Sequence, residues 1–277
     1  MAHFKVGVEN GTDIEIYYED HGSGSPVVLI HGYPLNGRSW ERQQRELLAA
    51  GYRAINYDRR GFGLSSQPTT GYDYDTFAED LRKLVTTLEL RDFALVGFSM
   101  GGGEVARYLG AHGSKRVSKA VFMSAITPFR LKTPDNPAGA ERAVFEELQK
   151  SIAADRPALL SGFLANFYNV DTLKGTRISD DAVRLSWSIA AGASPKGTLD
   201  CVQAWLTDFR PDLKRIDVPT LVVHGDDDRI LPLAATGKRT QECVKGSRLA
   251  VIKGGPHGLN WTHAEEVNRE LLAFLAA

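Results

Sequence analysis

The segment Gly97-Phe98-Ser99-Met100-Gly101 decides the fold, because it sets a serine between two glycines just after a short apolar run. The run at residues 93–96 predicts a β-strand, and residues 102–109 predict the first turns of a helix. A serine on such a strand-to-helix turn can hold its hydroxyl exposed on strained backbone, as in a nucleophile elbow. Glycine is needed on both sides, because a Cβ there would crowd the tight crossing. Five-residue patterns also arise by chance, so the interpretation depends on partners elsewhere in the chain.

Short apolar runs alternate with helical patterns on both sides of this segment. Strands that alternate with helices predict a mainly parallel sheet with helices on both faces. Helices are predicted at residues 40–50, 74–88 and about 262–275. Eight strands are predicted, at residues 4–8, 14–19, 27–30, 53–57, 93–96, 120–123, 220–223 and 249–252.

This alternation stops between about residues 128 and 209. The segment has no strand-like run, is rich in helix-forming residues and is interrupted by four prolines, at 134, 137, 157 and 195. We therefore predict an all-helical insertion that covers the sheet as a cap. It is too short to build a core of its own, so the prediction is a single domain over residues 1–277 that includes the cap.

Composition excludes some classes of partner. The chain has 277 residues, 43% hydrophobic and 24% charged, which is ordinary for a globular enzyme. A formal net charge of −1 gives no electrostatic reason to expect a nucleic acid or an anionic membrane as partner. Cys201 and Cys243 are too few for a disulfide framework or a zinc site and suit a reducing compartment. With no apolar signal peptide or membrane-spanning run, the prediction is a soluble, cytoplasmic protein.

Ser99 needs a base, because a serine hydroxyl is a weak nucleophile at neutral pH. Sites in parallel sheets form at the carboxyl ends of the strands. Of the seven histidines, His257 lies in a glycine- and proline-containing loop between the last strand and the last helix, so it is the candidate base. His224 and His31 also follow strands, but their neighbours favour a role in ordering turns.

The base in turn needs an acid that fixes its tautomer. Three carboxylates, at residues 226–228, follow the strand at 220–223. Asp226 is suited to turning the chain after Gly225, whereas Asp228 is better placed to reach into the end of the sheet. We predict Asp228 as the acid, with Asp226 as the alternative. The resulting chain order of serine, aspartate and histidine is the order associated with α/β-hydrolases.

Acyl transfer also needs hydrogen-bond donors aimed at the oxyanion that develops. The backbone N–H of Met100, directly after the serine, is one candidate. The backbone N–H of Tyr33, in the loop that follows the strand at 27–30, is the other. Pro34 can shape this loop but has no N–H to donate.

From residue 27 to its end the chain resembles the α/β-hydrolase superfamily. More narrowly, it resembles the cofactor-free haloperoxidases, or perhydrolases, a group that includes arylesterases and γ-lactamases. The motifs that carry the resemblance are HGYPL at 31–35, YDRRGFG at 57–63, YDYDTFA at 72–78, VGFSMGGG at 96–103, DFR at 208–210 and WTHA at 261–264.

The resemblance implies the α/β-hydrolase fold and the triad Ser99, Asp228 and His257, with the amides of Tyr33 and Met100 as the oxyanion hole. It implies no metal, haem, flavin or other cofactor. The substrates it implies are small esters, lactones or cyclic amides, with water or hydrogen peroxide as the second substrate. Peroxide would release a peracid that oxidises halide, which is the haloperoxidase activity. A homo-oligomer is also implied, and Pro34 after the oxyanion-hole residue is typical of perhydrolase-like and lactamase-like members.

Aromatic residues predict an apolar substrate pocket. Phe98, Phe129, Trp187 and Trp205 are the predicted lining residues, and Phe163 is a further candidate. Arg59 and Arg60 are better explained as structural residues of their loop. A ligand-binding protein of the same fold that has lost its chemistry is the alternative, whereas serine at position 99 disfavours the related enzymes that use an aspartate nucleophile.

Overall fold

The computed structural model describes residues 2–277. One sheet of eight strands runs in the order β1-β2-β4-β3-β5-β6-β7-β8. The hairpin β1-β2 is antiparallel and β2 pairs antiparallel with β4, while all other neighbours are parallel. This confirms the predicted eight-stranded, mainly parallel sheet. The strands are β1 (Ala2–Glu9), β2 (Thr12–His21), β3 (Pro26–Ile30), β4 (Arg53–Tyr57), β5 (Phe93–Phe98), β6 (Val117–Met123), β7 (Thr220–Gly225) and β8 (Arg248–Ile252).

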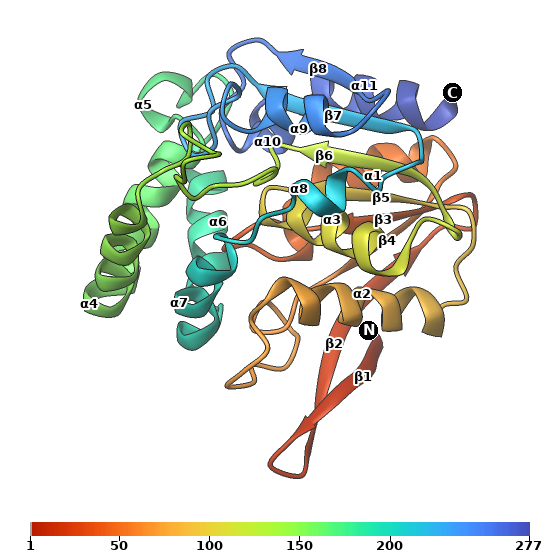
Figure 1. The fold of residues 1–277 in the computed structure, drawn as a ribbon, viewed down its shortest axis with the longest axis horizontal. Helices are drawn as coiled ribbons and strands as arrows, with labels where there is room; N and C mark the ends of the chain where they lie inside the picture. The colour runs from red at the N-terminus through yellow and green to blue at the C-terminus, as the bar shows by residue number, and fades with distance from the viewer. Residues whose placement is uncertain (1) are drawn as a thin grey trace.

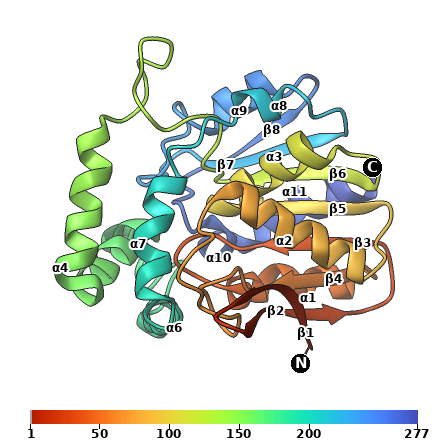
Figure 2. The same cartoon turned by 60° about the horizontal axis from the view of Figure 1, so that its bottom comes forward.

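Helices cover both faces of this sheet (Figures 1 and 2). Each connection between parallel strands carries at least one helical segment, as a parallel sheet requires. The helices are the 3-10 helix η1 (Gly37–Trp40), α1 (Glu41–Ala49), α2 (Tyr74–Thr87), α3 (Met100–His112), α4 (Arg142–Phe167), α5 (Val170–Leu173), α6 (Asp180–Ala191), α7 (Pro195–Ala204), α8 (Arg210–Leu213), α9 (Gly237–Cys243), α10 (Leu259–Thr262) and α11 (Ala264–Ala276).

The central strands are apolar on both faces because each face has its own core. In β3, Val28 and Ile30 pack in one core with residues of α2 and α3. Val27 and Leu29, which alternate with them, pack in the other core with residues of α1 and α11. Successive side chains of a strand point to opposite faces, so a strand with helices on both sides must be continuously hydrophobic. The unbroken apolar runs in the sequence have this cause.

The chain between β6 and β7 carries α4 to α8. Figures 1 and 2 place α4, α6 and α7 together beside one end of the sheet, the end toward which β6 and β8 point. Helix α4 is interrupted at Asp155, whose φ of −154° and ψ of 82° are not helical. The Asp155 carboxylate accepts a hydrogen bond from the N–H of Ala158 and so caps the second half of the helix.

The first part of this segment differs from our expectation of an all-helical insertion. Residues 128–141 form a loop closed by isolated bridges, Leu131 with Ala140 and Thr133 with Asn136. Pro134 and Pro137 within it have no N–H to contribute to a helix. Helical structure begins only at Arg142.

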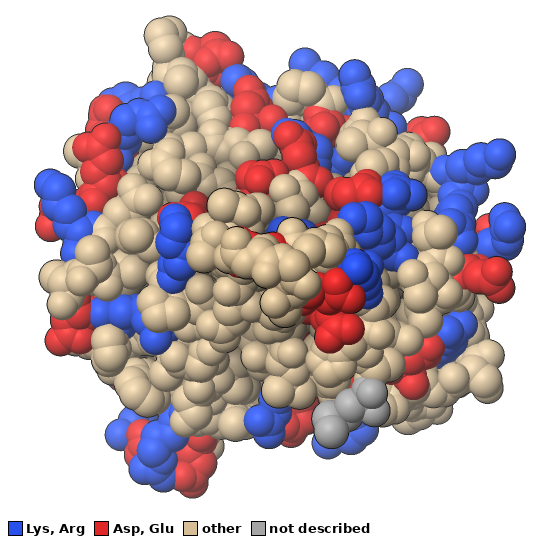
Figure 3. All heavy atoms as spheres, turned by 90° about the horizontal axis from the view of Figure 1, so that it is seen from below, with Lys and Arg blue, Asp and Glu red and all other residues tan. Residues whose placement is uncertain are grey.

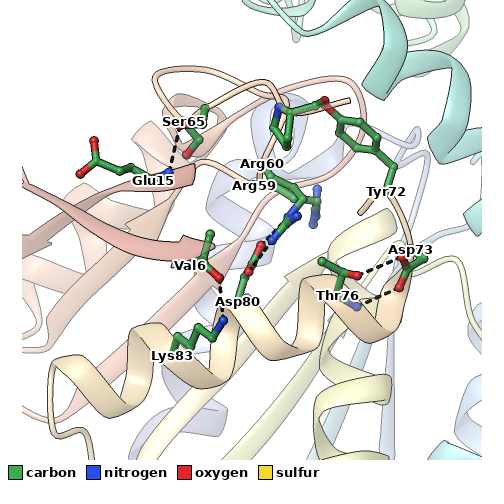
Figure 4. A network of polar contacts seen from close by, with 12 residues as sticks. Val6, Glu15, Arg59, Arg60, Ser65, Tyr72, Asp73, Thr76, Asp80 and Lys83 are labelled. Carbon is green, nitrogen blue, oxygen red and sulfur yellow. Dashed lines mark hydrogen bonds and ion pairs between the residues drawn. The ribbon is translucent and has the colours of Figure 1, made fainter. Parts of the chain in front are cut away.

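The loop after β4 is fastened to α2 by a buried ion pair (Figure 4). Arg60 donates two hydrogen bonds to the carboxylate of Asp80, at 2.7 and 2.8 Å. Helix α2 itself begins at a cap, because the Asp73 side chain accepts from the N–H of Thr76. Arg59 points the other way and pairs with the buried Glu104 of α3, at 2.7 Å. Both arginines therefore hold the protein together, as expected from the sequence.

We expect Asp80→Ala to destabilise the fold by about 3 kcal/mol, because it leaves the Arg60 guanidinium buried without its counter-ion. The matched control is Glu79→Ala on the same helix. The side chains of the Arg60–Asp80 pair are 7% and 4% exposed, whereas those of Arg82 and Glu79 are 43% and 37% exposed. The control should cost about 1 kcal/mol or less. Urea unfolding of both variants measures the difference, and equal losses would contradict the assignment.

Candidate active site

Ser99 sits on a strained turn between β5 and α3. Its φ is 54° and its ψ is −117°, a conformation that residues with a Cβ rarely adopt. The turn is tight enough to exclude side chains at its flanks. A Cβ on Gly97 would lie 2.4 Å from the Gly101 carbonyl oxygen, and a Cβ on Gly101 would lie 2.3 Å from that of Ile30. The glycines of the sequence pattern are therefore required by the backbone crossing.

The structure brings the three predicted side chains together in one hydrogen-bonded chain. The Oγ of Ser99 lies 2.9 Å from Nε2 of His257. The Nδ1 of the same imidazole lies 2.8 Å from Oδ2 of Asp228. Ser99, Asp228 and His257 are 7%, 5% and 0% exposed, so the chain of groups is shielded from water except at the serine end. They come from the loops after β5, β7 and β8, as the position of sites in parallel sheets predicts.

Asp228 is held as a carboxylate by several donors. Its Oδ1 accepts from the N–H groups of Ile230 and Leu231, at 2.9 and 2.7 Å. Burial alone would raise the pKa of the Asp228 carboxyl, but the imidazoles of His257 and His224 outweigh it and hold that pKa well below the ordinary value. A carboxylate that stays ionised is suited to orienting an imidazole.

His224 lies next to the candidate acid Asp228. From the sequence, His224 was expected only to order a turn. Its Nε2 lies 2.8 Å from the carbonyl oxygen of Leu231, which is the expected turn contact. The same atom also lies 3.2 Å from Oδ2 of Asp228. Because a carbonyl can only accept, Nε2 carries the proton, and His224 therefore also faces the acid as a donor.

Asp226, the alternative acid, is directed elsewhere. It is exposed, and its carboxylate accepts a hydrogen bond from the N–H of Gly254 at 2.6 Å. Asp226 therefore ties the loop after β7 to the loop that carries His257, which is the turn-forming role expected for it. The geometry favours Asp228 as the partner of the imidazole.

The loop after β3 passes directly over the serine. A Cβ on Gly32 would lie 2.8 Å from the Cβ of Ser99, so this loop and the elbow are in contact. Neither Tyr33 nor Met100 has an intramolecular acceptor for its N–H within residues 2–277. The N–H groups of Tyr33, in this loop, and of Met100, directly after the serine, are therefore unpaired within that range, and they stay the predicted oxyanion-hole donors.

Buried side chains hold this loop in place. The Nε2 of His31 accepts from the N–H of Arg59 at 2.9 Å, and the Arg59 guanidinium donates to the carbonyl of His31 at 3.0 Å. Burial, aided by the charge of Arg59, lowers the pKa of His31 well below its ordinary value. His31 is therefore a neutral acceptor that positions the loop, consistent with its predicted structural role.

A cavity of about 350 Å³ opens from Ser99. Trp205 lines it as predicted, and so does Phe163. The Tyr33 ring packs edge-on against Trp205 with centroids 4.8 Å apart, so this tyrosine contributes its side chain to the wall. Further apolar walls come from Ile126, Phe145, Leu148, Ile230 and Leu231.

Three predicted pocket residues lie outside this cavity. Phe98 is fully buried beneath the site, where its ring packs against those of Trp40 and Phe167. Phe129 lies under the guanidinium of Arg210, at 4.9 Å. Trp187 is on α6, and its indole N–H approaches the carbonyl of Pro157 at 3.4 Å. Strand alternation explains the first error, because Phe98 lies on the same side of β5 as Val96, and both pack in the core that holds α1 and α11.

The end of α4 and the residues after it contact the candidate base and the residue that precedes the candidate acid. The Phe167 ring at the end of α4 packs on the His257 imidazole at 4.8 Å, and the Phe167 carbonyl accepts from the N–H of Gly258. Asn169 donates to the main-chain and side-chain oxygens of Asp227, at 2.9 and 2.7 Å. These contacts were not predicted, since no short sequence pattern marks them.

Two features are absent from residues 2–277, a metal-binding cluster and a membrane-spanning helix. No group of three or more histidine, cysteine, aspartate or glutamate side chains in this range is arranged to hold a metal ion. In the same range, no helix combines the length and hydrophobicity needed to cross a membrane. On the face shown in Figure 3, basic and acidic side chains are interspersed without forming a continuous patch of one sign.

Comparison with known proteins identifies the family to which this chain belongs. The model of the alpha/beta hydrolase fold family matches residues 25–264. A Synechocystis protein provisionally named a non-heme chloroperoxidase is 62% identical, over 99% of this chain and 100% of its own. The bifunctional esterase/perhydrolase DCH of Acinetobacter calcoaceticus is 36% identical, over 95% and 96%. The crystal structure of a Bacillus anthracis bromoperoxidase superposes with a TM-score of 0.96 at 52% identity, covering 100% of this chain and 99% of that one. The chain therefore belongs to the α/β-hydrolase superfamily and, within it, to the group of cofactor-free haloperoxidases and perhydrolases.

Proposed function

We propose that this enzyme is a serine hydrolase that transfers small acyl groups through an acyl-enzyme on Ser99. The single observation that carries the proposal is the continuous chain of hydrogen bonds from Asp228 through His257 to Ser99, which ends in the cavity. A nucleophile, a base and an orienting acid in this geometry are the parts that acyl transfer needs.

The proposed reaction runs in two stages. Ser99 Oγ attacks the acyl carbon while its proton passes to Nε2 of His257, and the Asp228 carboxylate stabilises the imidazolium. The N–H groups of Tyr33 and Met100 bind the oxyanion, and His257 then gives its proton to the leaving group. A second nucleophile, activated by the same imidazole, attacks the acyl-enzyme and frees Ser99.

The identity of that second nucleophile separates two activities. Water gives a carboxylic acid, which is esterase activity. Hydrogen peroxide gives a peracid, which oxidises halide after release from the enzyme. The esterase/perhydrolase and haloperoxidase names of the relatives support both outcomes for this chain. Small esters, lactones and cyclic amides are the proposed substrates, in keeping with a largely apolar cavity of about 350 Å³.

The assembly and location are proposed on other grounds. We retain the expectations of a homo-oligomer, from the family resemblance, and of a cytoplasmic protein, from the cysteine content. We likewise propose that residues 1–277 act as one domain with a cap at about 128–209. Light scattering on the purified protein measures the oligomeric state.

Ser99→Ala should reduce hydrolysis of p-nitrophenyl acetate by about 10⁶-fold, because the triad acts as a unit. A fluorophosphonate should add its mass to Ser99 of the unaltered protein and not to the variant. Mass spectrometry and the rate of nitrophenol release check both results. An unlabelled Ser99 in folded protein, with no turnover, would favour the non-catalytic binding protein instead.

Asp228→Asn should lower kcat by about 10⁴-fold, because an amide favours the wrong imidazole tautomer. Asp226→Asn is the matched control, since its amide oxygen can still accept from the N–H of Gly254. We expect the control to stay within about threefold of the unaltered enzyme. If Asp226→Asn were the more damaging change, the acid would be misassigned.

Bromination of a dye should require acetate, hydrogen peroxide and bromide together, because the proposed oxidant is a peracid formed from the acyl group. The reaction should vanish in Ser99→Ala. The absorbance of the dye follows both experiments. Bromination without any carboxylic acid present would contradict the route through an acyl-enzyme.

A further inference from the structure

The cavity above Ser99 carries positive charge without a negative group in its wall. Its charged lining residues are Arg130 and Arg229, and the other side chains of the wall are uncharged. A pocket built only for an apolar acyl group has no use for two guanidinium groups. The two arginines differ, however, in whether the protein already neutralises them.

Arg229 is neutralised from within the protein. Its guanidinium forms an ion pair with the carboxylate of Asp171, at 2.8 Å. Arg130 has no such partner, since its guanidinium forms no side-chain hydrogen bond or ion pair with any of residues 2–277. The Arg130 guanidinium instead lies over the ring of Phe145, with its Cζ 5.6 Å from the ring centroid.

Arg130 nevertheless keeps its charge. Burial lowers the pKa of its guanidinium to about 10, against the opposing influence of Asp228, so the group remains a cation at neutral pH. The Arg130 side chain is half-buried in the cavity wall. A cation that has lost part of its hydration and has no counter-ion is stabilised by an anion that enters the same cavity. Such a group inside a substrate cavity marks a site for an anionic ligand.

The backbone holds Arg130 in position. Its carbonyl accepts from the N–H of Ala140 at 2.7 Å, which closes the loop at residues 128–141. The buried side chain of Asn136 donates to the carbonyls on both sides, those of Phe129 at 3.2 Å and Leu131 at 2.6 Å. The backbone that carries Arg130 is therefore fixed before the ligand arrives, which lowers the entropy cost of binding.

We propose that Arg130 binds a carboxylate carried by the substrate, so that the preferred substrates are esters or lactones of small molecules with a second, free carboxyl group. The planar fork of a guanidinium matches a carboxylate with two parallel hydrogen bonds. A single free arginine suits this monoanion better than a phosphate dianion, which would call for more donors. The proposal rests on the proposed function, since it places the ester carbon of the same molecule at Ser99.

The test compares two ethyl esters of equal length, monoethyl adipate and its neutral monoamide, by ethanol release. The unaltered enzyme should show a kcat/KM at least tenfold higher for the anion. Arg130→Gln should lower the ratio of the two values by about 10- to 100-fold, mostly through KM, because a hydrogen bond to a charged group is lost in ground and transition states alike. Arg130→Lys should restore part of the ratio.

Arg229→Gln is the matched control, because that arginine lies in the same wall but is already paired. In Arg229→Gln, the ratio of kcat/KM for the anionic ester to kcat/KM for the neutral ester should stay within about threefold of the value for the unaltered enzyme. An equal fall of the ratio in both glutamine variants would overturn the assignment to Arg130. Hydrolysis of both esters with a ratio that Arg130→Gln leaves unchanged would overturn the proposal while the proposed function stands.

If neither ester is hydrolysed, the proposed function fails and the binding question is still decided. Calorimetric titration of the unaltered protein with monoethyl adipate should then show binding that Arg130→Gln loses. Failure of the unaltered protein to bind monoethyl adipate would overturn the proposal. Circular dichroism of each variant checks that it is folded.

Discussion

The backbone crossing at residues 97–101 is the constraint on which the rest of the structure depends. It leaves no room for a Cβ at Gly97 or Gly101, and it forces Ser99 into a positive φ. Strand β5 must therefore lie in the middle of the sheet, where neighbouring strands and α3 over-determine the strained turn. The loops after β3, β7 and β8 then converge on the one side chain that this turn exposes. The candidate oxyanion donors, base and acid all take their positions from that convergence.

Much of this arrangement could be predicted because it follows from local rules. Continuous apolar runs marked the strands, and the residue types at the strand ends marked Ser99, His257 and Asp228. The choice of Asp228 over Asp226 could also be made from the sequence, since a carboxylate directly after Gly225 is suited to a turn. His224 was harder. Its contact with Leu231 is local, but its approach to the acid depends on how the loop after β7 folds back, and no spacing rule encodes that.

The cavity wall could not be predicted for a related reason. An aromatic residue in the cap sequence indicates burial but not the neighbour it is buried against, so Phe129 and Trp187 were assigned to a cavity wall that they do not line. Phe98 shares a side of β5 with Val96 and packs in the core below the site. Arg130 lies in a loop that had been expected to be helical, and only the folded structure shows that its charge has no counterpart. The reactive residues at the strand ends are marked by short sequence patterns. The residues of the cavity wall are brought together by contacts between distant segments, which no short pattern marks.

The contacts between α4 and the loop of His257 have a consequence for how substrates enter. Because Phe167 packs on the imidazole and accepts from the N–H of Gly258, the end of α4 cannot swing away without unseating the base. Asn169 adds a second attachment, next to the acid. These contacts join the second half of α4 to the loop of the candidate base, so the two are expected to move as one unit. A substrate that reaches Ser99 would then have to enter the cavity without displacing this end of α4.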